Sequence, residues 1–313
     1  LAWRRLRRNR LALFFGGVFL VIVILCLLAP VYSHDVAHTG LADEHISEKV
    51  NIGGKLQYVV STTSIPIGPT WHSRFFLGAD ANGRDTAVRL LYGGRNSLEI
   101  GVIATLITMV LALVLGIVAG YFRGVTDGVI TRLLDVIWAY PAVLLGVALG
   151  VSLAVGGINF GLFTLSGNTL LVPAFVIGFV YIPYVAKPVR AQVLTLRERE
   201  FVDAARQQGL SHWRIMISEI LPNLASTIIV FIPLILANAI LLEAGLSYLG
   251  AGVQPPNPSW GTMISDGIAT IPAAFHNVLV PGIMLVLAVL SINIFGDGLR
   301  DALDPRAKVR ISH

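Results

Sequence analysis

The sequence has little charge and almost no cysteine. Asp, Glu, Lys and Arg make up 13% of its 313 residues, while 55% are hydrophobic. Soluble domains carry about a quarter charged residues, so this composition excludes an ordinary water-soluble globule. The apolar content also excludes a disordered chain. The single cysteine, Cys26, lies in an apolar run, so cysteine usage says nothing about the redox compartment.

Sequence motifs for common kinds of chemistry are also missing. None of the four lysines stands in the Gly-rich spacing of a phosphate-binding loop, and no His-Glu-x-x-His motif is present. Residues 245–249 lack the final glycine of a nucleophile elbow. His34, His38 and His45 lie in a polar segment where histidines are usually solvated, so we predict no metal site. We therefore expect no catalytic residue, metal or cofactor in this chain, which is not expected to be an enzyme.

Long runs without charge are present instead. A helix needs about 20 apolar residues to cross a bilayer, and we expect helices because lipid leaves backbone groups no partner outside a helix or a closed barrel. The first run is longer than the apolar core of a cleaved signal peptide, so this helix should be retained. The uncharged stretch 136–186 is long enough for a hairpin of two spans, with turn formers at 156–157 and 166–168. The six predicted spans are 11–33, 100–122, two within 136–186, 220–242 and 278–296.

The distribution of basic residues predicts the orientation. Most of the 23 Lys and Arg residues fall in segments that face the cytoplasm if the N-terminus is inside, and the two short outer connections hold none. Both termini are therefore predicted to be cytoplasmic, and the N-terminal arginines to contact anionic lipid rather than nucleic acid. The expected organisation is a basic arm and first helix at 1–30, an extracytoplasmic loop at 31–97, a core of five transmembrane helices at 98–297 and a cytoplasmic tail at 298–313.

Ionisable groups within the spans are few, which bears on the source of energy. Ion-coupled carriers usually rely on midplane carboxylates or broken helices, so we expect the driving force to come from outside the chain. Glu243 is the best candidate for a translocation-path or gate residue, with a structural pair to a cation of a partner chain as the alternative. Asn238 is expected to face the same cavity. Trp260 ends a Pro-rich loop near the pore mouth, or is an interfacial anchor.

Glycine pairs within two of the spans predict close helix contacts. Gly116 and Gly120 are four residues apart, as are Gly146 and Gly150. Small residues at this spacing let helix backbones approach closely in membranes. The contacts are interpreted either as shearing surfaces or as ordinary static packing.

The longest inner connection, 188–222, predicts a helix, a sharp turn and a second helix. Strong helix formers fill 197–208, and Gly209 is placed to end that helix in a left-handed cap. Ser211 can cap a second short helix over 212–219. Apolar residues on this connector favour a knob that docks into a groove of a partner, and a solvated surface helix is the alternative.

This connection resembles the EAA loop of ABC-importer permeases, the element that docks on the ATPase subunits. An Asp-Ala-Ala sequence is followed by Gly209 and then by a Leu-Pro pair. Asp203 stands where the family usually has Glu, and Glu219 where it has Ile. Aspartate keeps the charge with a shorter reach, so the loop should still dock. The resemblance implies an ATPase-coupling segment at 201–222 with these residues: Phe201, Asp203, Ala204, Ala205, Gly209, Leu210, Leu221 and Pro222.

Other motifs are similar to the dipeptide/oligopeptide/nickel permeases of the DppC/OppC type. They lie at 77–98, 243–261 and 296–305, whereas residues 31–77 match least. The resemblance implies an all-α membrane protein with the type I ABC-importer permease fold in the bacterial inner membrane. It also implies partners: a homologous permease subunit, two ATPases that bind ATP and Mg, and an extracytoplasmic binding protein.

The implied function is to form half of the translocation path for peptides or similar small solutes. In that family, closure of the ATPases is transmitted through the EAA loops and rocks the permease halves. Pro222 lacks the amide that would continue a helix unbroken, so the loop should move as a unit while the spans tilt. Two alternatives stay open, an ion-coupled secondary carrier and a non-transporting membrane receptor or scaffold. Transport by this chain alone in proteoliposomes would identify the carrier.

Overall fold

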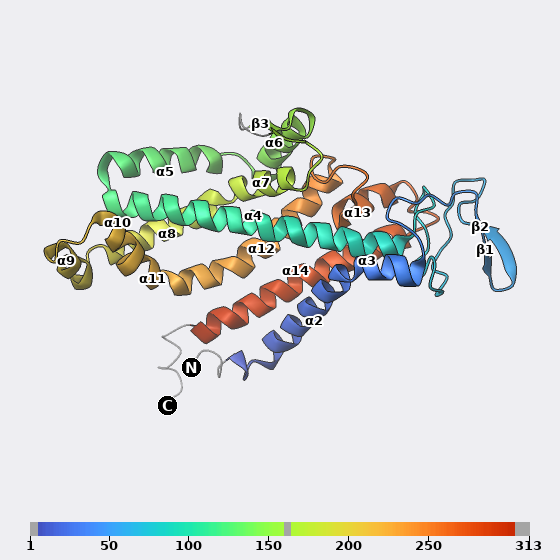
Figure 1. Ribbon diagram of the computed structural model, residues 1–313, viewed down its shortest axis with the longest axis horizontal. Helices are drawn as coiled ribbons and strands as arrows, with labels where there is room; N and C mark the ends of the chain where they lie inside the picture. The colour runs from blue at the N-terminus through green and yellow to red at the C-terminus, as the bar shows by residue number, and fades with distance from the viewer. Residues whose placement is uncertain (1–5, 160–163, 304–313) are drawn as a thin grey trace.

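The computed structural model describes residues 6–159 and 164–303. It is an elongated bundle of helices, with a lobe of loops and a β-hairpin at one end and a short-helix loop at the other (Figure 1). The start of the predicted basic arm, residues 1–5, and the end of the predicted tail, residues 304–313, lie outside the described residues.

The membrane-spanning helices agree in number with the six predicted spans if each bent pair is one span, but the two spans predicted within 136–186 lie at 124–156 and 171–196. Counted over the described residues, four helices are long and apolar enough to cross a bilayer, and two bent pairs bring the number to six if each pair is one span. The bends measure 88° and 42°. The four single helices are α2 (Arg10–Leu27), α4 (Thr86–Phe122), α12 (Ala225–Tyr248) and α14 (His276–Leu303). The bent pairs are α5 (Gly124–Trp138) with α6 (Ala142–Gly156), and α7 (Leu171–Val180) with α8 (Ile182–Leu196).

Short elements connect these helices. The end with the lobe of loops is called the outer end, and the opposite end the inner end, after the predicted orientation. Near the outer end lie α3 (Ala29–Val31), the π-helix η1 (Tyr32–Ala37) and α13 (Trp260–Ile268). Near the inner end lie α9 (Glu200–Gln207), α10 (His212–Arg214), the π-helix η2 (Ile215–Ile220) and α11 (Leu221–Asn223). Two antiparallel hairpins complete the fold, β1 (Lys49–Ile52) with β2 (Lys55–Tyr58), and β3 (Ile158–Asn159) with β4 (Thr164–Leu165).

Helix α4 lies at the centre of the bundle and packs along α7, α8 and α12. Its glycines bring it close to α8, as the sequence predicted. A Cβ atom added at Gly116 would lie 2.8 Å from the carbonyl oxygen of Ala186, and one at Gly120 would lie 2.7 Å from the Cβ of Val193. The close approach of α4 and α8 therefore requires glycine at both positions.

Helix α4 is longer than predicted, because hydropathy marks only the part of a helix that crosses the bilayer. The helix begins at Thr86 rather than Ile100, so the predicted loop 31–97 includes its first turns. Asp85 sets this start. Its carboxylate accepts hydrogen bonds from the backbone N–H groups of Ala87 (2.8 Å) and Val88 (3.1 Å), an N-cap arrangement. Similarly, α14 continues to Leu303, beyond the predicted boundary at 298.

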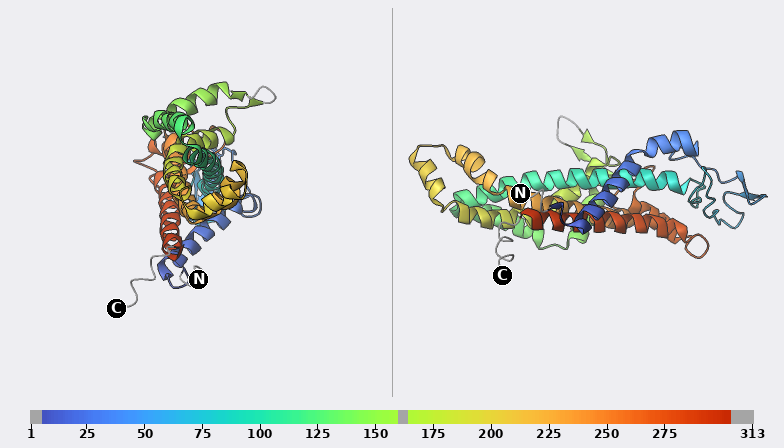
Figure 2. Two further views of the ribbon diagram at one scale, coloured as in Figure 1. Left: turned by 90° about the vertical axis from the view of Figure 1, so that its left-hand side faces the viewer. Right: turned by 90° about the horizontal axis from the view of Figure 1, so that it is seen from below.

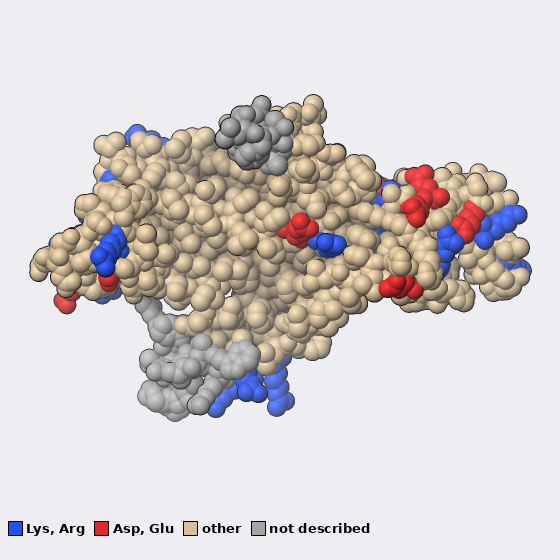
Figure 3. Space-filling view, viewed as in Figure 1, with Lys and Arg blue, Asp and Glu red and all other residues tan. Residues whose placement is uncertain are grey.

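The outer lobe, residues 38–85, has a small core of its own that includes Val59, Ile67 and Phe75. Asp85 joins this lobe to α4, because it also accepts a hydrogen bond from the Phe75 N–H at 2.6 Å. Burial raises the pKa of the Asp85 carboxyl, although these three backbone hydrogen bonds oppose the shift. Figure 3 shows charged side chains gathered at both ends of the molecule and along its lower edge, with a small patch of acidic and basic atoms on an otherwise uncharged body. This distribution fits a body that lies in the bilayer.

Candidate functional site

The predicted helix–turn–helix is present at the inner end of the bundle. Gly209 has a φ of +77°, the left-handed conformation expected from the sequence, and it ends α9. The Leu210 N–H donates to the Ala205 carbonyl at 3.2 Å, which closes the turn. Ser211 precedes the second helix, but its side chain makes no capping hydrogen bond. The second helix becomes π-helical from Ile215 and extends to Ile220, one residue beyond the prediction.

This segment, residues 197–222, is called the inner loop below, and it has two different faces. Val202, Ala205 and Ile215 are buried against the bundle. Three large apolar side chains point away from it, with exposed fractions of 37% for Phe201, 64% for Trp213 and 62% for Ile217. Figure 2 shows the loop projecting at the end of the bundle. Among the described residues nothing covers this apolar face.

The residues predicted for ATPase coupling do not all lie on the exposed face. Two of them, Leu210 and Leu221, are half-buried, and Ala205 lies on the buried face of α9. The others are exposed: Phe201, Asp203, Ala204, Gly209 and Pro222. Asp203 forms an ion pair with Arg206 at 3.0 Å. The sequence did not single out Ile217, which lies on the exposed face. Ile217 could have been recognised in the sequence as an apolar residue one helical turn after Trp213, because this spacing places both on the same side of a helix.

A residue outside the predicted set, Tyr121, connects the inner loop to the bundle. Tyr121 lies in the last turn of α4, and its hydroxyl is 2.9 Å from Nδ1 of His212. The guanidinium groups of Arg197 and Arg206 lie 5.9 and 5.7 Å from the centre of its ring. Arg197 also donates a hydrogen bond to the Tyr121 carbonyl oxygen. In the sequence Tyr121 resembles an aromatic residue of the membrane interface, so its role could not be recognised there.

Ion pairs strengthen the same junction. Arg123, next after α4, pairs with Glu198 at the start of the inner loop, and this pairing lowers the pKa of the Glu198 carboxyl below its usual range. In the helix that precedes the inner loop, Arg190 of α8 forms an ion pair with Asp127 of α5, and its Nη2 lies 2.6 Å from Oδ2 of the aspartate. The inner loop is therefore held to α4, while α8 is held to α5.

At the opposite end, Glu243 lies at the centre of a buried polar cluster. Its carboxylate is fully buried and accepts hydrogen bonds from the Ser97 hydroxyl of α4 at 2.7 Å and from the Ser247 hydroxyl of α12 at 2.6 Å. Ser247 in turn accepts a hydrogen bond from the Val253 N–H at 3.0 Å. Glu243 thus holds together α4, α12 and the loop that follows α12. We call residues 249–268, this loop with α13, the outer cap.

Trp260 belongs to this cluster, and Asn238 does not. The indole of Trp260 is fully buried and donates a hydrogen bond to the Leu90 carbonyl oxygen at 3.2 Å. This burial excludes the interpretation of Trp260 as an interfacial anchor, since an anchor must face the membrane surface. Asn238 is half-buried and donates to the Leu234 carbonyl oxygen within its own helix. Of the three residues predicted for a path or gate, the structure therefore brings Glu243 and Trp260 together and leaves Asn238 outside the cluster.

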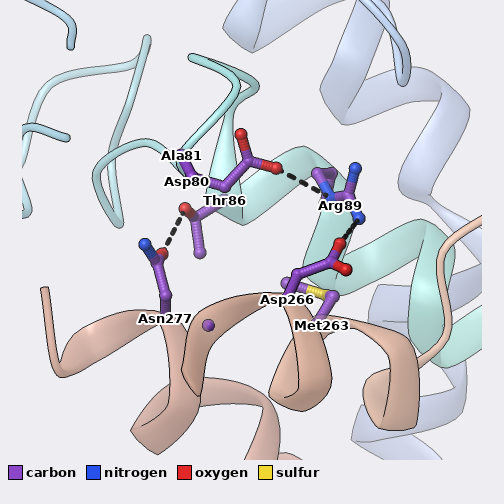
Figure 4. Close-up of a pocket in the computed structure, with 8 residues that line it drawn as sticks. Asp80, Ala81, Thr86, Arg89, Met263, Asp266 and Asn277 are labelled. Atoms are coloured by element: carbon purple, nitrogen blue, oxygen red, sulfur yellow. Dashed lines mark hydrogen bonds and ion pairs between the residues drawn. The ribbon is translucent and has the colours of Figure 1, made fainter. Parts of the chain in front are cut away.

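A charged cluster lies beside the outer cap (Figure 4). Asp80 pairs with Arg84 at 2.7 Å, and Arg89 lies 3.4 Å from Asp80 and 3.1 Å from Asp266 of α13. Nearby, the Thr86 hydroxyl donates to the Asn277 side chain at 3.0 Å, which joins α4 to α14. Arg84 and Arg89 also line a cavity of about 190 Å³ beneath the Pro-rich part of the cap. The outer lobe, α4, α13 and α14 are therefore joined at one place.

Comparisons with known proteins agree with this architecture. Residues 112–309 match the sequence model of a family described as "Binding-protein-dependent transport system inner membrane component". Residues 1–46 match the "N-terminal TM domain of oligopeptide transport permease C". The similarity to these two descriptions covers both the first helix and the permease core.

Several curated relatives are similar over three quarters of their length or more. The dipeptide transport system permease protein DppC of Alkalihalophilus pseudofirmus is 34% identical over 307 residues, which cover 98% of this chain and 90% of the relative. The glutathione transport system permease protein GsiD of Salmonella typhimurium is 37% identical over 308 residues, with the same coverage. The di/tripeptide transport system permease protein DppC of Pseudomonas aeruginosa is 39% identical over 77% of this chain and 76% of its own length.

A solved structure shares the fold. The inward-facing MetNI methionine ABC transporter contains a chain that superposes with a TM-score of 0.55 and 16% identity, covering 69% of this chain and 96% of that one. At this level of identity the likeness concerns the fold alone. It confirms the predicted type I ABC-importer permease fold.

Proposed function

Because this chain belongs to the family of binding-protein-dependent transport system inner membrane components, we propose that its inner loop docks on ATPase subunits and that its helices form half of a translocation path. The chain is a membrane-spanning permease component of an ABC importer in the bacterial inner membrane. Relatives are named for dipeptide, di/tripeptide and glutathione transport. Peptides or similar small solutes are accordingly the proposed cargo.

The observation that carries the docking proposal is the exposed apolar face of the inner loop. Phe201, Trp213 and Ile217 lie on a segment that projects past the bundle, where a large exposed apolar patch marks an interaction site. Gly209 fixes the turn between the two helices that carry these side chains. The face fits a groove on a partner protein. In this proposal ATP and Mg are bound by two ATPase subunits, and this chain holds no cofactor.

The other partners follow from the same assignment. A second, homologous permease subunit would complete the path, and an extracytoplasmic binding protein would deliver the solute at the end that carries the outer lobe. The proposed orientation places both termini in the cytoplasm. In support, Ala12 near the start of α2 packs in one cluster with Ala302 near the end of α14, at the end of the bundle where the inner loop lies.

Glu243, Trp260 and Asn238 stay proposed as residues of the path or its gate. Glu243 and Trp260 are fully enclosed within this chain. In the conformation described, a solute therefore cannot reach these two side chains. Asn238 is half-buried in α12, below the cap.

A substitution at Gly209 tests the docking proposal in the complete transporter. Gly209→Val places a β-branched residue at a φ of +77°, where it is strained although no atom lies within 4 Å of the added Cβ. We expect solute uptake and binding-protein-stimulated ATP hydrolysis to fall at least about tenfold, a change of about 1.4 kcal/mol in coupling, while membrane insertion is unchanged. Gly128→Val is the matched control, because Gly128 also has open space around it but lacks a positive φ. ATP-dependent uptake that is unchanged in Gly209→Val overturns the proposal.

A further inference from the structure

We propose that Tyr121 is a positioning residue that fixes the inner loop to α4, and that α4 transmits displacement of this loop to the outer cap. The proposal rests on the function proposed above, because it needs ATPases that move the loop. It assigns the transmission to a helix that is not adjacent to the loop in the sequence. The evidence lies at the two ends of α4 and in its continuity.

At the inner end, three separate parts of the loop meet one side chain. Arg197 precedes α9, Arg206 lies in its last turn and His212 begins α10, and all three contact Tyr121. Tyr121 itself is almost fully buried at the end of α4. A force on any of these three parts of the loop therefore acts on Tyr121. Because the ring packs among the loop and α8, the loop cannot shift far without breaking these contacts or moving α4.

Between its ends α4 is unbroken. It has 37 residues and contains no proline, and a helix of this length measures about 55 Å at 1.5 Å per residue. The helices that adjoin the loop in the sequence are interrupted. Helix α8 meets α7 at a bend of 42°, while the entry to α12 passes through a π-helix and Pro222, and Pro233 lies within α12. Prolines and π-helical turns are places where helices bend, so α4, which is one continuous helix despite its Gly93-Gly94 pair, is a more direct connection between the two ends than α8 or α12.

At the outer end, α4 holds the cap directly. Arg89 pairs with Asp266, the Leu90 carbonyl accepts from the Trp260 indole, and the Asn96 amide donates to the Pro258 carbonyl at 2.7 Å. These contacts reach both the Pro-rich loop and α13. The inner loop and the outer cap are therefore attached to opposite ends of the same helix (Figure 1). Movement of α4 carries the cap with it.

The structure also offers a competing route, from α8 to α5 through Arg190 and Asp127. This contact is made before the inner loop begins and leads to α5 and the bent α5–α6 pair. Helix α6 does reach the outer cap, but by apolar packing, with Gly150 against Ala251 and Leu149 in one cluster with Val253. Among the described residues no ion pair or side-chain hydrogen bond joins α6 to the cap. Substitution of Asp127 therefore separates the two routes.

The experiment measures solute taken up per ATP hydrolysed by the complete transporter in proteoliposomes. Tyr121→Leu removes the ring contacts and the hydroxyl, and we expect the ratio to fall by about fivefold or more, the lower range of coupling between sites. Tyr121→Phe keeps the packing and should cause a smaller loss. His212→Leu should lower the ratio about as much as Tyr121→Phe. The double variant should lose no more than either single variant, because both substitutions remove the same hydrogen bond between Tyr121 and His212. Asp127→Asn and Tyr140→Leu, at a tyrosine that is 58% exposed, should leave the ratio unchanged.

A distance measurement separates positioning from a loss of stability. Spin labels at Gln207 of α9 and Ile268 of the cap report whether loop and cap move together, and the single native cysteine, Cys26, is buried from the labelling reagent. In the otherwise unchanged protein the distance should be the same with and without ATP. In Tyr121→Leu it should change with ATP.

The outcomes distinguish this inference from the proposed function. A transporter without ATP-dependent uptake before any substitution overturns the proposed function. If uptake is present, a normal transport ratio in Tyr121→Leu overturns only the role of Tyr121 and α4. The role of Tyr121 and α4 is also overturned if the loop-to-cap distance changes with ATP in the unsubstituted protein. The same holds if Asp127→Asn lowers the transport ratio as much as Tyr121→Leu does.

Discussion

Arg89 of α4 and Asp266 of α13 form an ion pair of 3.1 Å between residues that are 177 positions apart in the sequence. The guanidinium is buried, whereas the Asp266 side chain is 51% exposed. Asp80 of the outer lobe lies 3.4 Å from the same guanidinium. The pair therefore fixes the outer cap to α4 at the point where the outer lobe also meets the helix.

Removal of the Asp266 charge should loosen this attachment. Asp266→Asn weakens a charged hydrogen bond to buried Arg89, but Asp80 still compensates the cation. We expect the free energy of unfolding to fall by about 1 kcal/mol, because the half-exposed Asp266 is screened by water and asparagine keeps a hydrogen-bond acceptor. Thermal unfolding of the purified protein in detergent measures this loss. Asp301→Asn, an exposed acid near the end of α14, is the matched control and should change stability by less than about 0.5 kcal/mol.

Glu243 should tolerate glutamine better than alanine. Glu243→Gln keeps one oxygen to accept from Ser97 or Ser247, whereas Glu243→Ala leaves both buried hydroxyls without their partner. Each lost partner costs about 1–3 kcal/mol, so the alanine variant should be the less stable by at least about 1 kcal/mol. Denaturant titration and the KM for uptake are measured together. A changed KM with unchanged stability would show that Glu243 contacts solute and is not mainly an anchor of the cap.

Substitution of Trp260 in the outer cap should affect stability, whereas substitution of Trp213 in the inner loop should affect partner binding. Trp260→Ala removes a fully buried indole and should lower the free energy of unfolding by about 3–5 kcal/mol. Trp213→Ala alters an exposed residue of the inner loop and should change stability by less than about 0.5 kcal/mol. It should, however, reduce co-purification of the ATPase subunits. Normal co-purification of Trp213→Ala would contradict the place of Trp213 in the docking face.

Asp85 predicts a pH dependence of stability at the outer lobe. Its folded pKa is raised above the ordinary 3.8 by burial, so the folded protein binds the proton more tightly than the unfolded chain. The resulting stabilisation is fully present below pH 3.8 and is lost as the pH rises through the folded pKa. Asp85→Asn lacks this titration. The unfolding free energy of the unsubstituted protein minus that of Asp85→Asn should therefore decrease as the pH is raised from 3.8 and should level off above the folded pKa. A difference that is independent of pH would contradict the assignment.

Much of the architecture could be predicted from the sequence because it depends on local properties. Uncharged runs located the four single helices and predicted the number of spans, since burial in lipid selects apolar residues one at a time, but they did not give the bounds of the two bent pairs. Gly209 identified the turn of the inner loop, since a left-handed residue at a helix end favours glycine regardless of what surrounds it. The helix–turn–helix of the inner loop could be predicted for the same reason. Its residues are contiguous.

Other features were decided by tertiary structure alone. Hydropathy placed the start of the second span at Ile100, but the helix continues outward to Thr86, where Asp85 caps it and the outer lobe covers its polar turns. The sequence allowed Trp260 to be an anchor at the membrane surface, and packing against Leu90 made it a core residue. Nothing in the sequence singles out Tyr121, because only the fold brings the inner loop onto it. These roles depend on contacts between residues far apart in the chain, and no local pattern of polarity or turn formers specifies which distant residue a side chain will meet.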